Sequence, residues 1–254
     1  MMMLTDLLAH PLGAPQATQA PLSVWEPLAV DRHGPGFLPP TSGTVYGSLL
    51  NHADALAALG EQVNAAPYKA PPKAPILYIK PRNTVVGHRS VVVVPADVSE
   101  LEIGATLGIV IGRAASRVAE SEALDFIAGY TIVNDISVPH ESLYRPSMRF
   151  KCRDGFCPIG PWVVPRAQVP NPDALGITVC IDGETVHRGS TAGLVRPVAR
   201  LLAAVTEFMT LHPGDVLSVG VAAGAPRVRA GQRVAIKIHG LGQLDNTFIA
   251  ESQA

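Results

Sequence analysis

The chain has 254 residues, and its 20 Lys and Arg residues against 21 Asp and Glu residues give a formal net charge of −1. This length suits one domain, or one domain with a small subdomain, and can bury a substantial core. The balanced charge argues against a nucleic-acid surface, and no apolar run is long enough to predict a membrane span. Three cysteines without paired spacing argue against a disulfide framework or a zinc site and favour a reduced cytoplasm.

The chain divides into two parts by composition. Residues 1–40 are rich in Pro, Gly and Ala, show no sustained period, and predict a loosely ordered N-terminal arm or small subdomain. Residues 41–254 carry the apolar runs and predict the main domain.

Short apolar runs in the main domain predict strands. They lie at residues 43–50, 76–79, 91–94, 107–111, 130–133, 177–181, 185–187, 216–219, 234–238 and 248–250. Asp182-Gly183, between two of these runs, is a strong hairpin signal.

Three segments predict helices, at residues 51–59, 119–128 and 194–209. Ser121 is a candidate cap for the second, and Pro197 is placed in the first turn of the third, where proline is tolerated. Many short strands with few helices indicate a mainly β fold of the α+β kind.

The most informative stretch is Phe150–Trp162, which sets Lys151, Arg153 and Asp154 beside a bulky apolar segment. Its closely spaced prolines predict an irregular, stiffened segment. Two interpretations stay open at this point. The stretch is a surface turn whose Trp162 fills the core, or a wall beside which a lysine acts on a bound anion.

The pattern Lys-x-x-Asp-x-Phe-x-Pro-x-Gly-Pro-Trp, which starts at Lys151, resembles the signature of the fumarylacetoacetate hydrolase family. Three further motifs match in the same order, at residues 78–84, 129–135 and 208–215, so the resemblance covers about residues 44–250. It implies the mixed β-roll of that family with a few flanking helices, and packing as dimers.

The resemblance also implies where a metal would be held. Family members usually bind a divalent cation through a Glu-x-Glu pair and the Asp of an Asn-Asp pair, oxygen ligands that suit Mg²⁺, Ca²⁺ or Mn²⁺. Here the glutamate positions read Gly104 and Thr106, and only Asp135 matches. Glu100 and Glu102 lie four residues too early and are interpreted as solvated loop charges. We therefore expect no tightly bound metal.

Other departures affect residues that act on protons. The lid positions usually held by His and Glu read Ala55 and Ala58, and His52 replaces a tyrosine. His52 is a candidate acid or base, although a hydrogen-bonded structural histidine is the favoured interpretation. Cys152 and Cys157 are interpreted as small packing groups and not as nucleophiles.

Together these departures resemble one subfamily, the first half or separate first subunit of the isomerase/decarboxylases of 4-hydroxyphenylacetate (homoprotocatechuate) degradation. That resemblance implies as substrates a 5-carboxymethyl-2-hydroxymuconate-type intermediate and its oxo-tricarboxylate precursor, which need cationic partners. The implied substrate-binding residues are Lys80, Arg82, Arg145 and Arg153, and the implied catalytic residues are Lys151, Asp135 and His52.

Two functions are compatible with these residues. The chain is an enzyme subunit that isomerises or decarboxylates a small polycarboxylate, or it is a catalytically silent, metal-less partner that stabilises a metal-bearing paralogue. Either predicts a homodimer, or a heterodimer with that paralogue, and neither implies a nucleic-acid or membrane partner.

Overall fold

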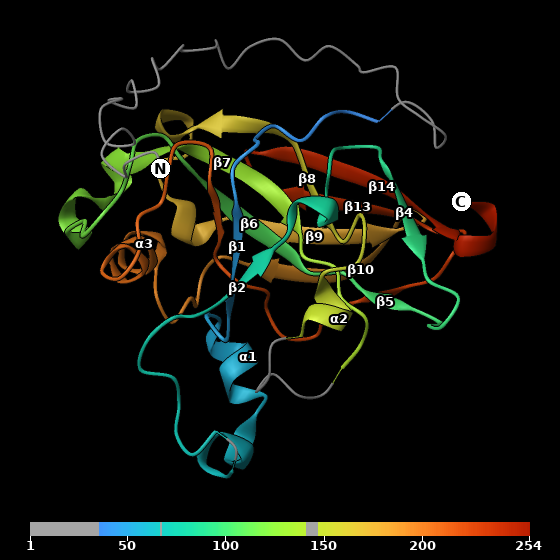
Figure 1. Cartoon of the computed structure of the whole chain (residues 1–254), viewed down its shortest axis with the longest axis horizontal. Coiled ribbons are helices and arrows are strands. Elements are labelled where there is room, and N and C mark those ends of the chain that lie inside the picture. The colour runs from blue at the N-terminus through green and yellow to red at the C-terminus, as the bar shows by residue number, and fades with distance from the viewer. Residues whose placement is uncertain (1–35, 67, 141–146) are drawn as a thin grey trace, which may run out of the picture.

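The computed structural model describes residues 36–66, 68–140 and 147–254 (Figure 1). Of the predicted N-terminal arm, only residues 36–40 fall within these ranges. The main domain is mostly β, as the sequence predicts. No helix of the described residues is long and apolar enough to cross a membrane.

The strands form a seven-stranded sheet, a five-stranded sheet and a short ribbon. The larger sheet has the order β2-β1-β11-β6-β7-β8-β3, the smaller β10-β9-β13-β14-β4, and the ribbon pairs β12 with β5. The strands are β1 Val45–Leu49, β2 Ile76–Lys80, β3 Val85–Val86, β4 Val91–Val94, β5 Leu101–Glu102, β6 Ala105–Ile111, β7 Ile127–Asn134, β8 Cys157–Pro165, β9 Gly176–Ile181, β10 Glu184–Ser190, β11 Val216–Ser218, β12 Arg227–Val228, β13 Arg233–Ile238 and β14 Gly242–Ala250.

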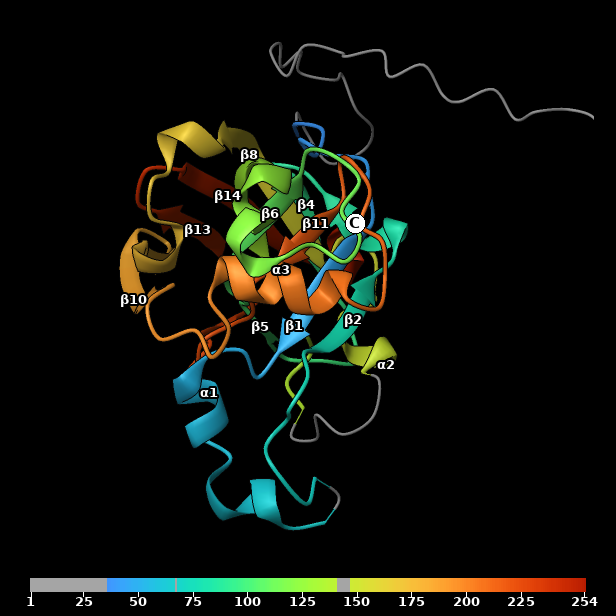
Figure 2. The same ribbon diagram turned by 90° about the vertical axis from the view of Figure 1, so that its left-hand side faces the viewer.

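The two large sheets curl around one apolar core, which α3 (Val198–Thr206) closes on one side (Figures 1 and 2). Leu107 of β6 and Ile236 of β13 are fully buried in it, as is Leu201 of α3. Burial of such alternating apolar residues from both sheets is the main stabilising term of the fold.

Several local predictions are confirmed and two helices are corrected. Asp182-Gly183 joins β9 to β10 with positive φ at both residues, as the hairpin signal requires. The third helix begins only after Pro197, which occupies its N-cap and not its first turn. The predicted helix at 119–128 is a 3₁₀ segment, Glu120–Phe126, because it lacks a side-chain cap and runs directly into β7.

The sequence predicted an irregular segment around Pro161, and this prediction was wrong. Cys157–Pro165 forms β8, a nine-residue strand. The register of β7 against β8 shifts between Tyr130 and Ile132, whose partners are Val164 and Gly160. Pro161 lies inside this shift, so the ladder does not need the N–H that it lacks. Trp162 is 47% exposed and does not fill the core.

One segment projects from the sheets. Helix α1 (Ala53–Ala57) and the 3₁₀ segment Gly60–Asn64 lie below them in both views (Figures 1 and 2). We call residues 53–64 the projecting arm; its helix and 3₁₀ segment contain no buried residue. The short helix α2 (Met148–Lys151) ends beside the carboxyl end of β2, where Lys80 Nζ donates to the Lys151 carbonyl at 2.8 Å.

Candidate active site

A pocket of about 240 Å³ lies where the middle of β2, the chain after β7 and the end of α2 meet. Tyr78, Asp135 and Lys151 line it from these three elements. The base of the projecting arm contributes Ala55, and the loop after β11 contributes Val221 and Ala222. The pocket therefore joins three of the sequence motifs that were matched to the family.

Asp135 is the centre of a buried charge cluster. Its Oδ1 lies 2.7 Å from Lys80 Nζ, and its Oδ2 accepts hydrogen bonds from Lys151 Nζ at 2.9 Å and from the Tyr78 hydroxyl. The side chains of Lys80 and Asp135 are only 1% and 3% exposed. We call Tyr78, Lys80, Asp135 and Lys151 the Asp135 cluster. Two ammonium groups against one carboxylate leave it one excess positive charge.

The two lysines are held differently. Lys80 Nζ also donates to the carbonyls of Ile136, Lys151 and Phe156 at 2.8–2.9 Å, which engages all three of its N–H bonds. Lys151 Nζ has only Asp135 as a hydrogen-bond acceptor within the part of the chain that is described, and lies 5.0 Å from the centre of the Tyr78 ring. Lys80 is therefore a structural cation, whereas Lys151 keeps donors for a ligand.

Two glycines make room for the cluster. A Cβ on Gly47, opposite Tyr78 on β1, would collide with the Tyr78 ring. A Cβ on Gly104, just before β6, would collide with the carbonyl of Asp135. The two backbones are this close because the Asp135 N–H donates a hydrogen bond to the Gly104 carbonyl. These close approaches set Tyr78 and Asp135 side by side.

The protonation states follow from these contacts. Burial acts to raise the pKa of Asp135, but the charges of Lys151 and Lys80 and the hydrogen bonds to its carboxylate hold that pKa well below its usual range. Burial, followed by the negative charge of Asp135, raises the pKa of Tyr78 well above its ordinary value. Asp135 is thus ionised and Tyr78 protonated across the physiological pH range.

Two of the other predicted substrate-binding cations, Arg82 and Arg153, do not line this pocket. Arg82 lies in the 3₁₀ segment Arg82–Thr84 and lines a separate hollow with Leu38 and Ile79. Arg153 forms a bidentate ion pair with Asp97, at 2.7 and 2.9 Å. Arg145 lies outside the described residues.

Two more motif side chains are also accounted for. His52 is buried and lines a neighbouring pocket of about 280 Å³, and burial lowers its pKa. Asp154, the aspartate of the central motif, accepts a hydrogen bond from Asn83 at 2.6 Å.

Three pocket residues were missed from the sequence. Tyr78 precedes Lys80 by two positions in β2, and strand alternation could have placed both on one face. Glu102 was interpreted as a solvated loop charge, but it lines the pocket. Its backbone pairs with that of Ser137 in an isolated antiparallel β-bridge. It is two residues before Gly104, so extended backbone returns it to the same face. No sequence pattern singled out His140, which also lines the pocket.

The donor set does not fit the hard divalent cation that the family implies. Gly104 offers no ligand, and Thr106 Oγ1 is committed to the carbonyl of Gly220 at 2.6 Å. Asp135 already faces two ammonium groups, which repel a cation. Within the described ranges, no group of three His, Cys, Asp or Glu side chains is arranged to hold a metal. The lack of a tightly bound cation stays a prediction.

The cysteines beside this site are poor nucleophiles. Burial raises the pKa of Cys157 to about 12, so its thiol stays protonated. Burial also raises the pKa of Cys152, whose Sγ lies 3.7 Å from the Ile79 carbonyl oxygen.

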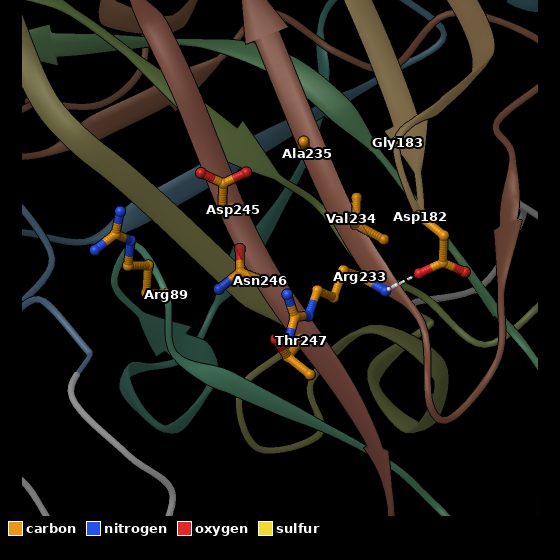
Figure 3. Close-up of a pocket in the computed structure, with 9 residues that line it drawn as sticks. All are labelled: Arg89, Asp182, Gly183, Arg233, Val234, Ala235, Asp245, Asn246 and Thr247. Carbon is orange, nitrogen blue, oxygen red and sulfur yellow. Dashed lines mark hydrogen bonds between the residues drawn. The ribbon is translucent and has the colours of Figure 1, made fainter.

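A larger hollow of about 820 Å³ lies on the five-stranded sheet (Figure 3). Arg89 and Arg233 line it together with Asp182 and Asp245, so its charges balance. None of the matched motif residues contributes to its described lining. We therefore assign the chemistry to the pocket beside the Asp135 cluster.

Comparison with known proteins identifies the family of the chain. The family model for the fumarylacetoacetate (FAA) hydrolase C-terminal domain matches residues 44–249. The chain therefore belongs to the fumarylacetoacetate hydrolase family, and its fold is the one expected of that family.

Among individual proteins, the chain is 41% identical over 211 residues to the 4-hydroxyphenylacetate degradation bifunctional isomerase/decarboxylase of Escherichia coli, over 83% of this chain and 48% of that protein. It thus spans about half the length of the bifunctional relatives that it matches.

Two solved structures are also similar. The 5-carboxymethyl-2-hydroxymuconate delta-isomerase of Mycobacterium smegmatis is 30% identical, with a TM-score of 0.73 over 85% of this chain and 83% of that chain. The 2-hydroxyhepta-2,4-diene-1,7-dioate isomerase of Mycobacterium marinum is 28% identical, with a TM-score of 0.72 over 85% of this chain and 78% of that chain.

Proposed function

We propose that this chain is a subunit of the isomerase/decarboxylase system of 4-hydroxyphenylacetate catabolism, and that its own step is the isomerisation of 5-carboxymethyl-2-hydroxymuconate. The names of the E. coli relative and of the two similar structures support this choice. The observation that carries it is the excess positive charge of the Asp135 cluster beside a pocket of about 240 Å³. Such a pocket attracts a small polycarboxylate.

The contacts of Lys151 decide how a substrate is held. Lys151 and Asp135 form an ion pair, so Lys151 does not face the pocket as an uncompensated charge. It has three N–H donors, however, and can give one to a substrate carboxylate while it keeps Asp135. The neighbouring Tyr78 hydroxyl and Lys80 hold Asp135 in place during this exchange. In the reaction, Lys151 would stabilise negative charge that develops on the substrate 2-oxygen.

Isomerisation suits this donor set better than decarboxylation. Moving a proton along a dienol needs an acid and a base, which side chains supply. Loss of CO₂ needs a group that stabilises the negative charge of the enolate, and in the family a metal ion held by carboxylate ligands would supply this. Gly104 and Thr106 do not provide those ligands here.

A second candidate is the catalytically silent partner subunit. It is favoured by the engagement of Asp135 with Lys80, Lys151 and Tyr78, which leaves the cluster able to hold the fold without any substrate. The match to only about half of the bifunctional relatives also favours a chain that works beside a second one.

Assembly and compartment belong to the same proposal. We propose a homodimer, or a heterodimer with a metal-bearing paralogue, in the cytoplasm. Leu38 and Ile79 are more than half exposed and line one hollow, which is apolar surface that a partner subunit would cover. All three cysteines are free thiols, as expected in a reducing compartment.

The test is an assay of the purified chain, alone and with the metal-bearing paralogue, with and without added Mg²⁺. We expect the chain alone to isomerise 5-carboxymethyl-2-hydroxymuconate without Mg²⁺ and to leave the oxo-tricarboxylate intact. Isomerisation that occurs only when the paralogue is present, at the rate of the paralogue alone, would establish the silent partner instead.

A further inference from the structure

His140 is held in one orientation at the edge of the candidate active site. It follows β7 by a few residues and lines the same pocket as Asp135 and Lys151. Its ring stacks on Phe150, with 5.0 Å between ring centres and an angle of 11° between planes. Its Nδ1 lies 2.8 Å from the carbonyl oxygen of Val138. Stacking and hydrogen bond together restrict both side-chain torsions.

The contact with Val138 defines the tautomer of the ring. A carbonyl oxygen only accepts hydrogen bonds, so Nδ1 must carry a proton. In the neutral ring, Nε2 then holds a free lone pair. This atom is buried, and it has no hydrogen-bond partner among the described residues. Buried polar atoms without a partner are rare, and one beside a pocket indicates a group that the ligand satisfies.

The surroundings suit a base that works on an anionic substrate. Among the described residues, the charged groups that line the pocket with His140 are Lys151, Asp135 and Glu102. Lys151 and the cluster attract the substrate carboxylates, whereas Glu102, 29% exposed and 3.9 Å from Arg227, lies on the ribbon side. Neither Asp135 nor Tyr78 is available as a base, because Asp135 is bound by two lysines and the Tyr78 hydroxyl donates to it.

We infer that His140 is the catalytic base and proton carrier of the isomerisation, an inference that rests on the proposed function. Nε2 takes the proton of the 2-hydroxyl group, and the O–H electrons pass into the diene to give a 2-oxo group and a carbanion delocalised to C5. The imidazolium then returns the same proton to C5 from Nε2, and the remaining double bond lies between C3 and C4. No other reactant is consumed, and His140 ends neutral.

The variant His140→Asn separates this role from a structural one. An asparagine amide can still donate to the Val138 carbonyl, but it has no group in the place of Nε2. His239→Asn is the matched control, because His239 is exposed and lies outside the pocket. We expect kcat of His140→Asn to fall by about 10²–10⁴-fold, the usual contribution of a positioned base, with KM and melting temperature close to those of the wild type. His239→Asn should keep the wild-type kcat.

The outcomes distinguish this inference from the proposed function. If the wild type isomerises the substrate and His140→Asn keeps a kcat within a few-fold of it, His140 is not the base and the proposed function stands. If the wild type alone has no isomerase activity, the proposed function and the role of His140 fall together.

A second measurement applies if His140→Asn does not fold. In wild-type protein with ¹⁵N-labelled histidine, we expect the His140 signals to show protonated Nδ1 and unprotonated Nε2, and the Nε2 signal to shift when 2-oxoadipate is added. An Nε2 that is protonated in the neutral ring, or one that does not respond while 2-oxoadipate binds, would overturn the assignment.

Discussion

The Asp135 cluster and the projecting arm border the same pocket, but they are built in opposite ways. In the cluster, two buried lysines and the buried Asp135 meet the partly buried Tyr78 through ion pairs and hydrogen bonds from three separate elements. In the arm, helix α1 and the following 3₁₀ segment bury nothing, and Ala55 alone reaches the described lining of the pocket. The wall formed by the Asp135 cluster is therefore part of the packed domain, whereas the wall formed by the projecting arm is only attached to that domain.

This difference assigns the two walls different tasks. A buried charge cluster costs desolvation and persists only when its partners stay in place, so it keeps donors in a fixed geometry. A segment without buried apolar contacts opens at low cost in free energy. We therefore expect the cluster to define what binds and the arm to control access.

The largest effect should come from Asp135→Asn. It leaves the ammonium groups of Lys80 and Lys151 buried without a counter-charge, and breaking a buried pair in this way typically costs about 3–5 kcal/mol. The free energy of unfolding, measured by urea denaturation, should fall by that amount. Asp97→Asn is the control, because it removes only the exposed partner of Arg153 and should change stability far less. Equal losses for the two variants would contradict a structural role of the cluster.

The pH dependence provides an independent check on the same carboxylate. The pKa of Asp135 is lowered in the folded state, whereas an unfolded Asp has a pKa of about 4. Its contribution to stability is thus fully present above about pH 5 and is lost as pH falls below about 4. The difference in unfolding free energy between wild type and Asp135→Asn should shrink over that acidic range and stay constant above it.

A smaller loss is expected for Gly104→Ala, because the added Cβ meets the Asp135 carbonyl and overpacking typically costs about 1–3 kcal/mol. Gly176→Ala adds the same atom into open space and serves as the control.

Gly104→Glu would restore a family ligand position, yet calorimetry should show no tight Mg²⁺ binding, since the lysines still hold Asp135. Tight Mg²⁺ binding by Gly104→Glu with an unchanged melting temperature would show that the cluster can rearrange around a metal.

The sequence predicted the fold well where local patterns decide it. Apolar runs and the Asp182-Gly183 turn predicted most strands. The strand β8 was not predicted, because its prolines were taken to exclude a regular element. Pro161 is tolerated by a register shift that only the pairing with β7 reveals. The 3₁₀ segment at 120–126 shows the same limit, since its length is set by the strand that follows it.

The candidate site was predictable only in part. Lys151, Asp135 and Lys80 were all named from motifs, and they do lie together. Arg153 is two residues beyond Lys151, but it lies past the end of α2 and pairs with Asp97 away from the pocket. Glu102 and His140 were missed because their positions depend on strand pairing and on the chain after β7, which no local pattern encodes.

The smallest effect should come from Ala57→Gly in the projecting arm. Glycine costs at most about 1 kcal/mol relative to alanine within a helix, and Ala57 is the last residue of α1, so the loss should be smaller still. Because α1 buries no residue, this loss should shift only local opening and not global unfolding. The melting temperature should stay at the wild-type value, while amide hydrogen exchange within residues 53–57 becomes faster. Leu201→Ala in the buried face of α3 is the control and should lower the melting temperature strongly, because it removes a fully buried side chain. If Ala57→Gly lowers the melting temperature as much as Leu201→Ala, the arm belongs to the same cooperative unit as the Asp135 cluster, and the division between a fixed wall and a loosely attached one fails.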